Sequence, residues 1–282
     1  MTQTPGVLYV VATPIGNLAD ITTRACQVLG EVDLVACEDT RHSRPLLRRL
    51  GLDKPLLAFH EHNEDEVTPR LLAMLTQGNA IALISDAGTP LISDPGFGLV
   101  RAARQQGIPV VPVPGPSAVI SALSAAGLPS DRFLFVGFPP RTDSARQTWL
   151  SALVEEPGTL ICYESGRRAA ATLRDMAVAF GPRPAVVARE LTKRFETFLS
   201  GDLPNLADQV AADSDQQLGE LVILVEGDRR DAEQRDGAEQ QRILGILGEA
   251  LPLKQAVALT VRITGGNRNE LYRRALEGKS EG

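Results

Sequence analysis

Short apolar runs alternate with helical patterns along the first half of the chain, and this alternation is what most constrains the fold. Five runs have the length and composition of buried strands, at residues 7–11, 34–37, 56–59, 81–84 and 110–113. Helical patterns lie between them, at about residues 21–29, 46–50, 67–75 and 97–106, with Asp20 as the expected N-cap of the first. Strands separated by helices favour a largely parallel sheet with both faces covered.

The alternation continues after residues 112–116, whose prolines and glycine mark the expected junction between two domains. Apolar runs follow at residues 133–137, 159–163, 185–189, 196–199 and 221–225. Two of them, 185–189 and 196–199, have no helix between them, so the second sheet is expected to be mixed.

A charged segment and a helical tail complete the chain. Residues 227–237 are densely charged and lack apolar periodicity, which is typical of a linker. Helical patterns follow at about residues 239–250, 254–263 and 269–276. We therefore expect an N-terminal α/β domain at residues 1–115, a C-terminal α/β domain at 116–227, a charged linker at 228–237 and a helical tail at 238–282.

Composition and charge limit the class of protein. No apolar run approaches the ~20 residues that span a bilayer, and the first residues lack the charged start of a signal peptide. The three widely spaced cysteines, Cys26, Cys37 and Cys162, indicate reduced core thiols in a cytoplasmic protein. The net charge of −6 argues against a chain that is basic throughout. The tail from residue 237 carries seven Lys or Arg against five Asp or Glu. This mildly basic balance favours nucleic-acid binding and, equally, a helical cap that covers a sheet or supports a dimer.

The stretch at residues 81–98 combines a buried strand with two polar turns. The apolar run at 81–84 ends in Ser-Asp-Ala-Gly-Thr-Pro, and a second turn, Ser-Asp-Pro-Gly, follows at 93–96. Open α/β folds bind ligands in the crevice at such strand ends. An ordinary strand-to-helix connection is the alternative, but two turns so close together favour a ligand site.

Carboxylates and a basic run follow the strand at residues 34–37. Glu38 and Asp39 are adjacent carboxylates that repel each other, which can raise the pKa of one of them and allow that residue to act as a base. The alternative is that the two acidic residues simply begin a helix. The basic side chains that come next could hold phosphates, although a solvated helix surface is favoured; they are Arg41, His42, Arg44, Arg48 and Arg49. His60 and His62 would share one face of a strand, but no third ligand joins them, so a polar loop is favoured over a metal site.

An ordered set of motifs gives the chain a close resemblance to a known family. The motifs lie at residues 13–18, 38–41, 60–64, 85–96, 114–118, 163–165, 189–193 and 222–227. Together they resemble the bacterial ribosomal RNA small subunit methyltransferase I family, a branch of the tetrapyrrole methylase superfamily. The resemblance covers nearly the whole chain, and the ordered set is far more specific than any single motif.

The resemblance implies a class III S-adenosylmethionine methyltransferase of the α/β class. Its two α/β domains would hold the cofactor in the cleft between them, with a small C-terminal helical appendage and a homodimeric assembly. The implied reaction is 2′-O-methylation of a cytidine ribose in the decoding region of 16S rRNA. The implied partner is that RNA within the assembled 30S subunit, with no metal and no membrane.

The resemblance also implies roles for individual residues. Those expected to hold the cofactor are Ile15, Asp86, Ala87, Gly88, Thr89, Ile92, Ser117, Ala118, Glu164 and Leu191. For Asp86 and Asp94 two roles stay open: each either shapes the loop or contacts a ligand. Glu38 matches a carboxylate proposed as a base in the tetrapyrrole enzymes. We expect Glu38 or Asp39 to take the proton and Arg41 to steady a phosphate. The basic residues of the tail could bind RNA phosphates; they are Lys254, Arg262, Arg268, Arg273 and Arg274.

Two departures from the family pattern and two alternative functions stay open. The chain has Tyr-Glu-Ser-Gly-Arg-Arg at residues 163–168, where the family has Tyr-Glu-Ser-Pro-His-Arg. Its first turn is Thr-Pro-Ile-Gly-Asn instead of the glycine-rich turn of the tetrapyrrole enzymes, which favours the RNA branch. The alternatives are a methylase of a tetrapyrrole or other small substrate, and a non-catalytic RNA-binding assembly factor.

Overall fold

The first half of the chain forms a five-stranded parallel sheet. The computed structural model describes residues 6–229, 232–266 and 271–273. The strands are β1 (Leu8–Val11), β2 (Leu34–Cys37), β3 (Leu56–Ala58), β4 (Ile81–Ile84) and β5 (Val110–Val113). They pair in the order β3-β2-β4-β1-β5, and every pairing is parallel. The expectation of a parallel sheet is confirmed.

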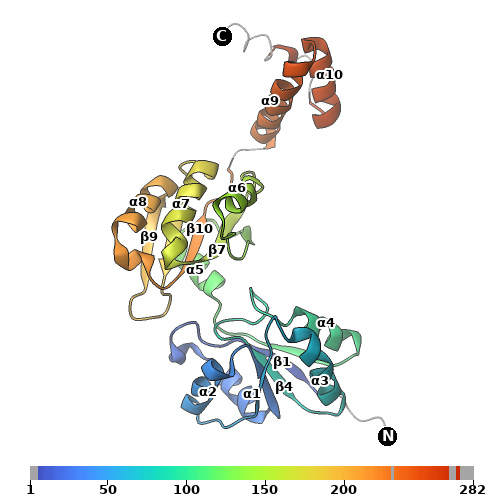
Figure 1. Cartoon of the computed structure of the whole chain (residues 1–282), viewed down its shortest axis with the longest axis vertical. Coiled ribbons are helices and arrows are strands. Elements are labelled where there is room, and N and C mark those ends of the chain that lie inside the picture. The colour runs from blue at the N-terminus through green and yellow to red at the C-terminus, as the bar shows by residue number, and fades with distance from the viewer. Residues whose placement is uncertain (1–5, 230–231, 267–270, 274–282) are drawn as a thin grey trace. The chain divides into compact units, whose positions relative to one another are not determined.

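Helices cover both faces of this sheet (Figure 1). They are α1 (Thr23–Glu31), α2 (Thr40–Arg49), α3 (Glu64–Thr76) and α4 (Phe97–Gln105), preceded by the short helix η1 (Leu18–Asp20). On one face, Leu71 of α3 and Leu99 of α4 pack on Leu83 of β4. On the other face, Leu29 of α1 and Leu47 of α2 pack on Ile84 of the same strand. Alternate residues of β4 therefore serve two separate cores.

The first helix begins later than the sequence predicts. Its N-cap is Thr22, whose Oγ1 accepts the backbone N–H of Ala25 at 3.1 Å. Asp20 is the last residue of η1 instead. The prediction of Asp20 as N-cap was wrong because residues 18–20 form a turn of their own before the chain enters α1.

The second half forms a mixed sheet. Its strands are β6 (Phe133–Phe135), β7 (Thr159–Ser165), β8 (Pro184–Arg189), β9 (Thr197–Asp202) and β10 (Glu220–Val225). They pair in the order β6-β7-β10-β8-β9. Only β6 and β7 pair in parallel, and the other three pairings are antiparallel. The expected mixed sheet is confirmed.

Helices also cover both faces of the second sheet. They are α5 (Ala118–Ala126), α6 (Asp143–Ser151), α7 (Gly166–Phe180) and α8 (Leu203–Ala212), with a short η2 (Ser214–Gln217) before β10. The helices α6, α7 and α8 pack on one face through Leu150, Leu173 and Leu206. On the other face, Val119 of α5 belongs to a buried cluster that also contains Ile15 from the turn after β1. This cluster joins the two halves of the chain.

The tail forms a separate helical unit with residues 155–157. It contains α9 (Ala232–Ala250) and α10 (Leu253–Thr264). Leu244 of α9 and Val257 of α10 are buried together with Leu271, which follows α10 in the chain. The helix predicted from about residue 239 begins at residue 232 instead, inside the segment predicted as a linker. Its Ala, Glu, Gln and Arg residues favour helix without needing an apolar face.

The third predicted helix, at about 269–276, falls largely outside the described residues, as do Arg268 and Arg274. Each predicted α/β domain holds one of the two sheets, while the exact boundaries given above stay predictions. Across the helices that are described, none has both the length and the apolar character needed to cross a membrane.

Candidate active site

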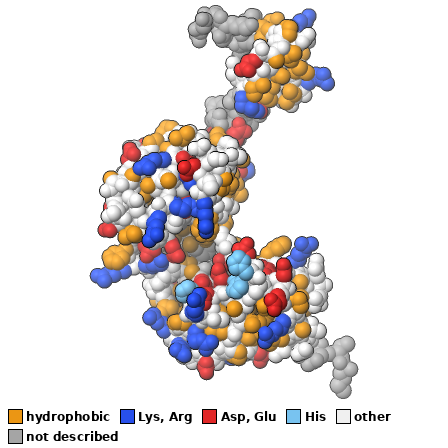
Figure 2. All heavy atoms as spheres, viewed as in Figure 1, with side chains coloured by type: hydrophobic (Ala, Val, Ile, Leu, Met, Phe, Trp, Pro, Cys, Tyr) orange, Lys and Arg blue, Asp and Glu red, His pale blue; other side chains and the backbone are white. Residues whose placement is uncertain are grey.

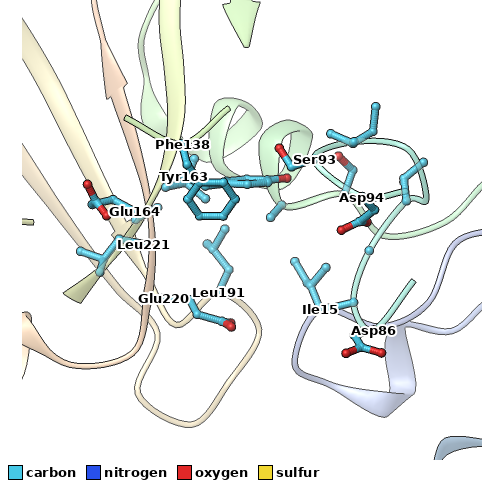
Figure 3. Close-up of a pocket in the computed structure, with 18 of the residues that line it drawn as sticks. Ile15, Asp86, Ser93, Asp94, Phe138, Tyr163, Glu164, Leu191, Glu220 and Leu221 are labelled. Atoms are coloured by element: carbon cyan, nitrogen blue, oxygen red, sulfur yellow. The ribbon is translucent and has the colours of Figure 1, made fainter. Parts of the chain in front are cut away.

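A cavity of about 390 Å³ opens where the strands of both halves end (Figure 3). The turns after β1, β4 and β5 supply one side of it, and β7, β8 and β10 with the adjoining loops supply the other. The carboxyl ends of parallel strands meet at one edge of a sheet, which brings the three turns together. All ten residues predicted to hold the cofactor line this cavity: Ile15, Asp86, Ala87, Gly88, Thr89, Ile92, Ser117, Ala118, Glu164 and Leu191.

Backbone contacts join the turns of the first half into one wall. The N–H of Thr13 donates to the carbonyl of Gly88 at 2.9 Å, and the N–H of Gly88 donates back at 3.1 Å. Thr13 Oγ1 also donates to the carbonyl of Ser85 at 3.2 Å. Thr89 Oγ1 donates to the carbonyl of Pro116 at 3.0 Å. The turn that begins at Ser85 is therefore fixed between its two neighbours.

Two aromatic side chains form the opposite side of the cavity. The Tyr163 ring meets Phe135 at a centroid distance of 4.8 Å and Phe138 at 5.5 Å, edge to face in both cases. Figure 3 shows Phe138 and Tyr163 across the cavity from Ile15 and Asp86. Burial raises the pKa of Tyr163 to about 12. The phenol is thus a neutral, rigid wall at physiological pH.

The cavity is strongly acidic. Its carboxylates are Glu38, Asp86, Asp94, Glu164, Glu190 and Glu220, whereas Lys193 is the one Lys or Arg in the described lining. Lys193 Nζ donates to Glu190 Oε1 at 2.8 Å and to Glu220 Oε2 at 3.0 Å. Acidic side chains are also visible on the surface where the two sheet-bearing halves meet (Figure 2). A cavity of this charge favours a cationic ligand.

Two of these carboxylates hold protons more readily than usual. Burial is the largest cause that raises the pKa of Asp94 to about 6, and the charges of Glu38 and Asp86 raise it further. A hydrogen bond from Ser85 acts in the opposite direction and lowers this pKa. Burial and then the charge of Asp86 raise the pKa of Glu38, while a hydrogen bond from the Asp86 backbone lowers it. A cation entering the cavity would favour the ionised form of both.

Glu164, near the end of β7, lines the cavity, but its carboxylate is occupied by Ser165 and by residues of the following helix, α7. The residue is only 2% exposed. Its Oε1 accepts the N–H of Ser165 at 2.8 Å, and its Oε2 accepts Thr172 Oγ1 at 2.7 Å. Arg168 Nη2 lies 3.2 Å from Oε2. The side chain therefore anchors the start of α7 against the cavity wall.

The departure from the family pattern at Gly166 has a structural reason. The N–H of Gly166 donates to the carbonyl of Gly219 at 2.8 Å. A Cβ on Gly166 would lie 2.5 Å from the backbone carbon of Gln217 and from the nitrogen of Leu218. Neither a proline, which lacks the N–H, nor any other side chain fits this close approach.

Asp39 and Arg41 lie outside the cavity lining, unlike Glu38. Asp39 is the N-cap of α2, and its Oδ1 accepts the N–H of Arg41 at 2.7 Å. The Arg41 guanidinium also reaches Asp39 Oδ2, with Nη2 at 2.6 Å. Hydrogen bonds from Arg41 lower the pKa of Asp39 to about 2. Asp39 is thus a weak base, and Arg41 already has a carboxylate partner.

Four residues in the cavity loops have a left-handed backbone that side chains rarely adopt. They are Leu91 (φ 73°), Ser93 (φ 70°), Glu190 (φ 51°) and Thr192 (φ 64°). Such strain persists where surrounding contacts fix the chain, and it is common at functional sites. The described residues show no other non-glycine residue with positive φ.

The loops of the two halves also meet directly. The N–H of Asn17 donates to Thr192 Oγ1 at 3.0 Å. A Cβ on Gly16 would lie 2.5 Å from Lys193 Cγ and 2.9 Å from the carbonyl of Leu191. Glycine at position 16 therefore allows the turn after β1 to pack on the loop after β8.

Several lining residues were not predicted as site residues. They are Ser93, Phe138, Tyr163, Ser165, Ala188, Glu190, Lys193, Glu220, Leu221 and Val222, together with Asp94, which was left open. Phe138 could have been found, because it directly follows the predicted strand at 133–137. Within the described ranges, no three His, Cys, Asp or Glu side chains are grouped closely enough to hold a metal ion.

Comparisons with known proteins give a consistent result. Residues 7–207 match the family model described as "Tetrapyrrole (Corrin/Porphyrin) Methylases", and residues 234–279 match one described as "RsmI C-terminal HTH domain". A protein of Pseudomonas aeruginosa named "Ribosomal RNA small subunit methyltransferase I" is 56% identical, covering 98% of this chain and 99% of its own. A protein of the same name from Xylella fastidiosa is 54% identical, covering 96% of this chain and 99% of its own.

Solved structures are similar in fold. A uroporphyrin-III-C-methyltransferase of Thermus thermophilus aligns with a TM-score of 0.57 at 22% identity, covering 78% of this chain and 94% of its own. A diphthine synthase aligns with a TM-score of 0.59 at 14% identity, covering 78% of this chain and 90% of its own.

Proposed function

Because the chain belongs to the ribosomal RNA small subunit methyltransferase I family of the tetrapyrrole methylases, we propose that it methylates 16S rRNA with S-adenosylmethionine. The proposed product is a 2′-O-methylated cytidine in the decoding region. The observation that carries this proposal is the single cavity lined by all ten residues expected to hold the cofactor. The full-length match to relatives of that name supports the substrate.

The cavity fits the proposed cofactor in size, charge and shape. Its volume of about 390 Å³ is in the range of small-molecule sites, about 300–1,000 Å³. When bound, S-adenosylmethionine supplies an activated methyl group on a sulfonium cation. The acidic lining suits that charge, and the small side chains of Ala87 and Gly88 leave room beside it. Ile15, Ala118 and Leu191 supply an apolar surface.

Glu38 is the proposed proton acceptor. A ribose hydroxyl is a poor nucleophile at neutral pH, so a base that removes its proton helps the oxygen attack the methyl carbon. Of the two carboxylates predicted for this role, Glu38 lines the cavity and has a raised pKa, whereas Asp39 is paired with Arg41. Glu38 would take the proton as the oxygen gains the methyl group. The predicted phosphate contact of Arg41 requires the arginine to share its charge with Asp39.

The helical tail and a second copy of the chain complete the proposal. Lys254, Arg262 and Arg273 are exposed and could hold phosphates of an assembled 30S subunit. The edge strand β6 exposes Phe133 and Leu134, which supports pairing with a second copy in a homodimer. Such an enzyme would act in the cytoplasm, where ribosomal subunits are assembled.

Methylation of purified 30S subunits tests the proposal directly. The full-length chain, S-adenosylmethionine and unmethylated 30S subunits should yield one methylated cytidine ribose in 16S rRNA by mass spectrometry. Glu38→Gln should lose most of this transfer and keep its affinity for the cofactor in a calorimetric titration. A chain that binds the cofactor but does not methylate RNA would favour the small-substrate methylase. A chain that does not bind it would favour the assembly factor.

The role of the tail is tested by removing residues 230–282. We expect this truncation to keep cofactor affinity, because every described residue that lines the cavity lies between positions 15 and 222. It should raise the KM for 30S subunits. Unchanged activity on 30S subunits would exclude a role of the tail in RNA binding.

A further inference from the structure

A second cavity, of about 290 Å³, lies beside the first. The two share five lining residues: Ile15, Asp86, Ala87, Lys193 and Glu220. In Figure 3, Asp86 and Glu220 lie at the edge of the first cavity away from Phe138 and Tyr163. The second cavity therefore begins at the shared wall, on the side away from the aromatic residues.

The polar centre of the second cavity is a pair formed by His42 and Asp86. Asp86 Oδ1 accepts the N–H of Asp39 at 3.1 Å, which fixes the carboxylate. Asp86 Oδ2 lies 3.0 Å from His42 Nδ1. Because an ionised carboxylate only accepts hydrogen bonds, Nδ1 carries the proton. The other ring nitrogen, Nε2, is then left for a hydrogen bond with a ligand.

The remaining lining suits a ligand with both a flat apolar face and hydroxyl groups. Pro14, Leu18 and Leu46 supply apolar surface. On the shared wall, the Lys193 ammonium lies between Glu190 and Glu220, and it can donate a further hydrogen bond. A ribonucleoside has this combination of a base with flat faces and a sugar with hydroxyls.

The helix α2, which lines the second cavity through His42, Ser43 and Leu46, also carries exposed positive charge. Arg44, Arg48 and Arg49 are exposed on this helix, and no carboxylate of the described residues forms an ion pair with them. Figure 2 shows basic side chains gathered over the region of α2. Such side chains hold the backbone phosphates of a nucleic acid and so position it.

Resting on the function proposed above, we infer that the second cavity receives the target nucleotide of the RNA, with His42, held by Asp86, as its hydrogen-bonding contact. Enzymes that modify a nucleotide commonly take it out of the stack into a pocket. A nucleotide in this cavity would have its ribose at the shared wall, next to the cavity proposed for the methyl donor. Asp86 acts here as a positioning residue, and His42 touches the substrate.

Steady-state kinetics of His42→Ala with 30S subunits test this inference. Losing one hydrogen bond should raise the KM for 30S subunits about three- to tenfold. The kcat should change less, and the dissociation constant for S-adenosylmethionine should stay within twofold. His42→Gln, which keeps a side chain able to form a hydrogen bond, should reverse part of the rise in KM. His62→Ala is the matched control, because His62 is exposed and lines neither cavity.

The outcomes separate this inference from the proposed function. If the wild type does not methylate 30S subunits, the proposed function is wrong and the inference falls with it. If the wild type is active and His42→Ala keeps its KM, only the inference is overturned. If the variant instead loses cofactor affinity, the second cavity holds part of the cofactor, and the inference is again overturned.

Discussion

Replacing Asp94 by asparagine should stabilise the protein in a way that depends on pH. Asp94 lies half-buried at the cavity wall, near the charges of Glu38 and Asp86. Burial and these charges raise its pKa from 3.8 to about 6. The native state therefore binds a proton that the unfolded chain has already lost between these two values. Asparagine has the same shape without the charge.

The sign and size of the effect follow from the linkage between protonation and folding. Ionised Asp94 destabilises the native state above pH 6, and the effect vanishes below the unfolded pKa of 3.8. A shift of about two units corresponds to about 3 kcal/mol as an upper limit. Water reaches the half-buried carboxylate, so about 1–2 kcal/mol is the reasonable expectation. For a unit of this size, that raises the Tm by about 2–8 °C.

Thermal unfolding followed by circular dichroism between pH 4 and pH 8 measures this effect. The Tm of Asp94→Asn should exceed that of the wild type at pH 7 and 8, and the difference should shrink towards pH 4. Asp53→Asn, at an exposed position, is the matched control and should follow the wild type at every pH. A constant difference across the range, or a lower Tm of Asp94→Asn at pH 8, would refute the reasoning.

Three further substitutions test individual contacts through chemical denaturation. Gly166→Ala should lower the free energy of unfolding by about 1–3 kcal/mol, because the new Cβ would lie 2.5 Å from backbone atoms. Gly201→Ala is the control and should lower it less, because the nearest side-chain atom to its Cβ would be 3.6 Å away. Thr172→Val should lower it by about 1–3 kcal/mol by removing a donor from buried Glu164, and Thr172→Ser should recover much of the loss. Asp39→Ala should lower the free energy of unfolding by about 0.5–2 kcal/mol by removing the N-cap of α2, whereas Asp39→Asn keeps a capping oxygen and should lower it less.

The strands could be predicted more closely than the helix starts. The runs at 34–37, 81–84 and 110–113 match β2, β4 and β5 residue for residue, because turn residues or charges bound each apolar run. By contrast, α3 begins at Glu64, three residues before the predicted start. Its first turn is Glu-Asp-Glu, whose acidic side chains favour the helix N-terminus, so apolar periodicity carries no signal there.

The parts of the candidate site that lie at strand ends could be predicted from the sequence. The contacts between charged residues that are distant in the sequence could not. The turns at 13–18, 85–96 and 114–118 are local features, and their gathering at one sheet edge follows from a parallel sheet. The sequence suggested that repulsion between Glu38 and Asp39 raises the pKa of one of the two. In the structure Asp39 turns to Arg41, and burial and Asp86 are the larger causes. A contact between residues 47 positions apart has no local signal.

The charges of the two cavities explain how a chain with a net charge of −6 can act on RNA. The cavity proposed for the cofactor carries six carboxylates against Lys193, which attracts a sulfonium and repels phosphates. The exposed arginines of α2 lie instead on the helix that lines the second cavity. An RNA strand that follows α2 would keep its phosphates near positive charge and outside the acidic cavity. Only an uncharged ribose and base then have to enter, so one acidic body can accept a cation and a polyanion at adjoining sites.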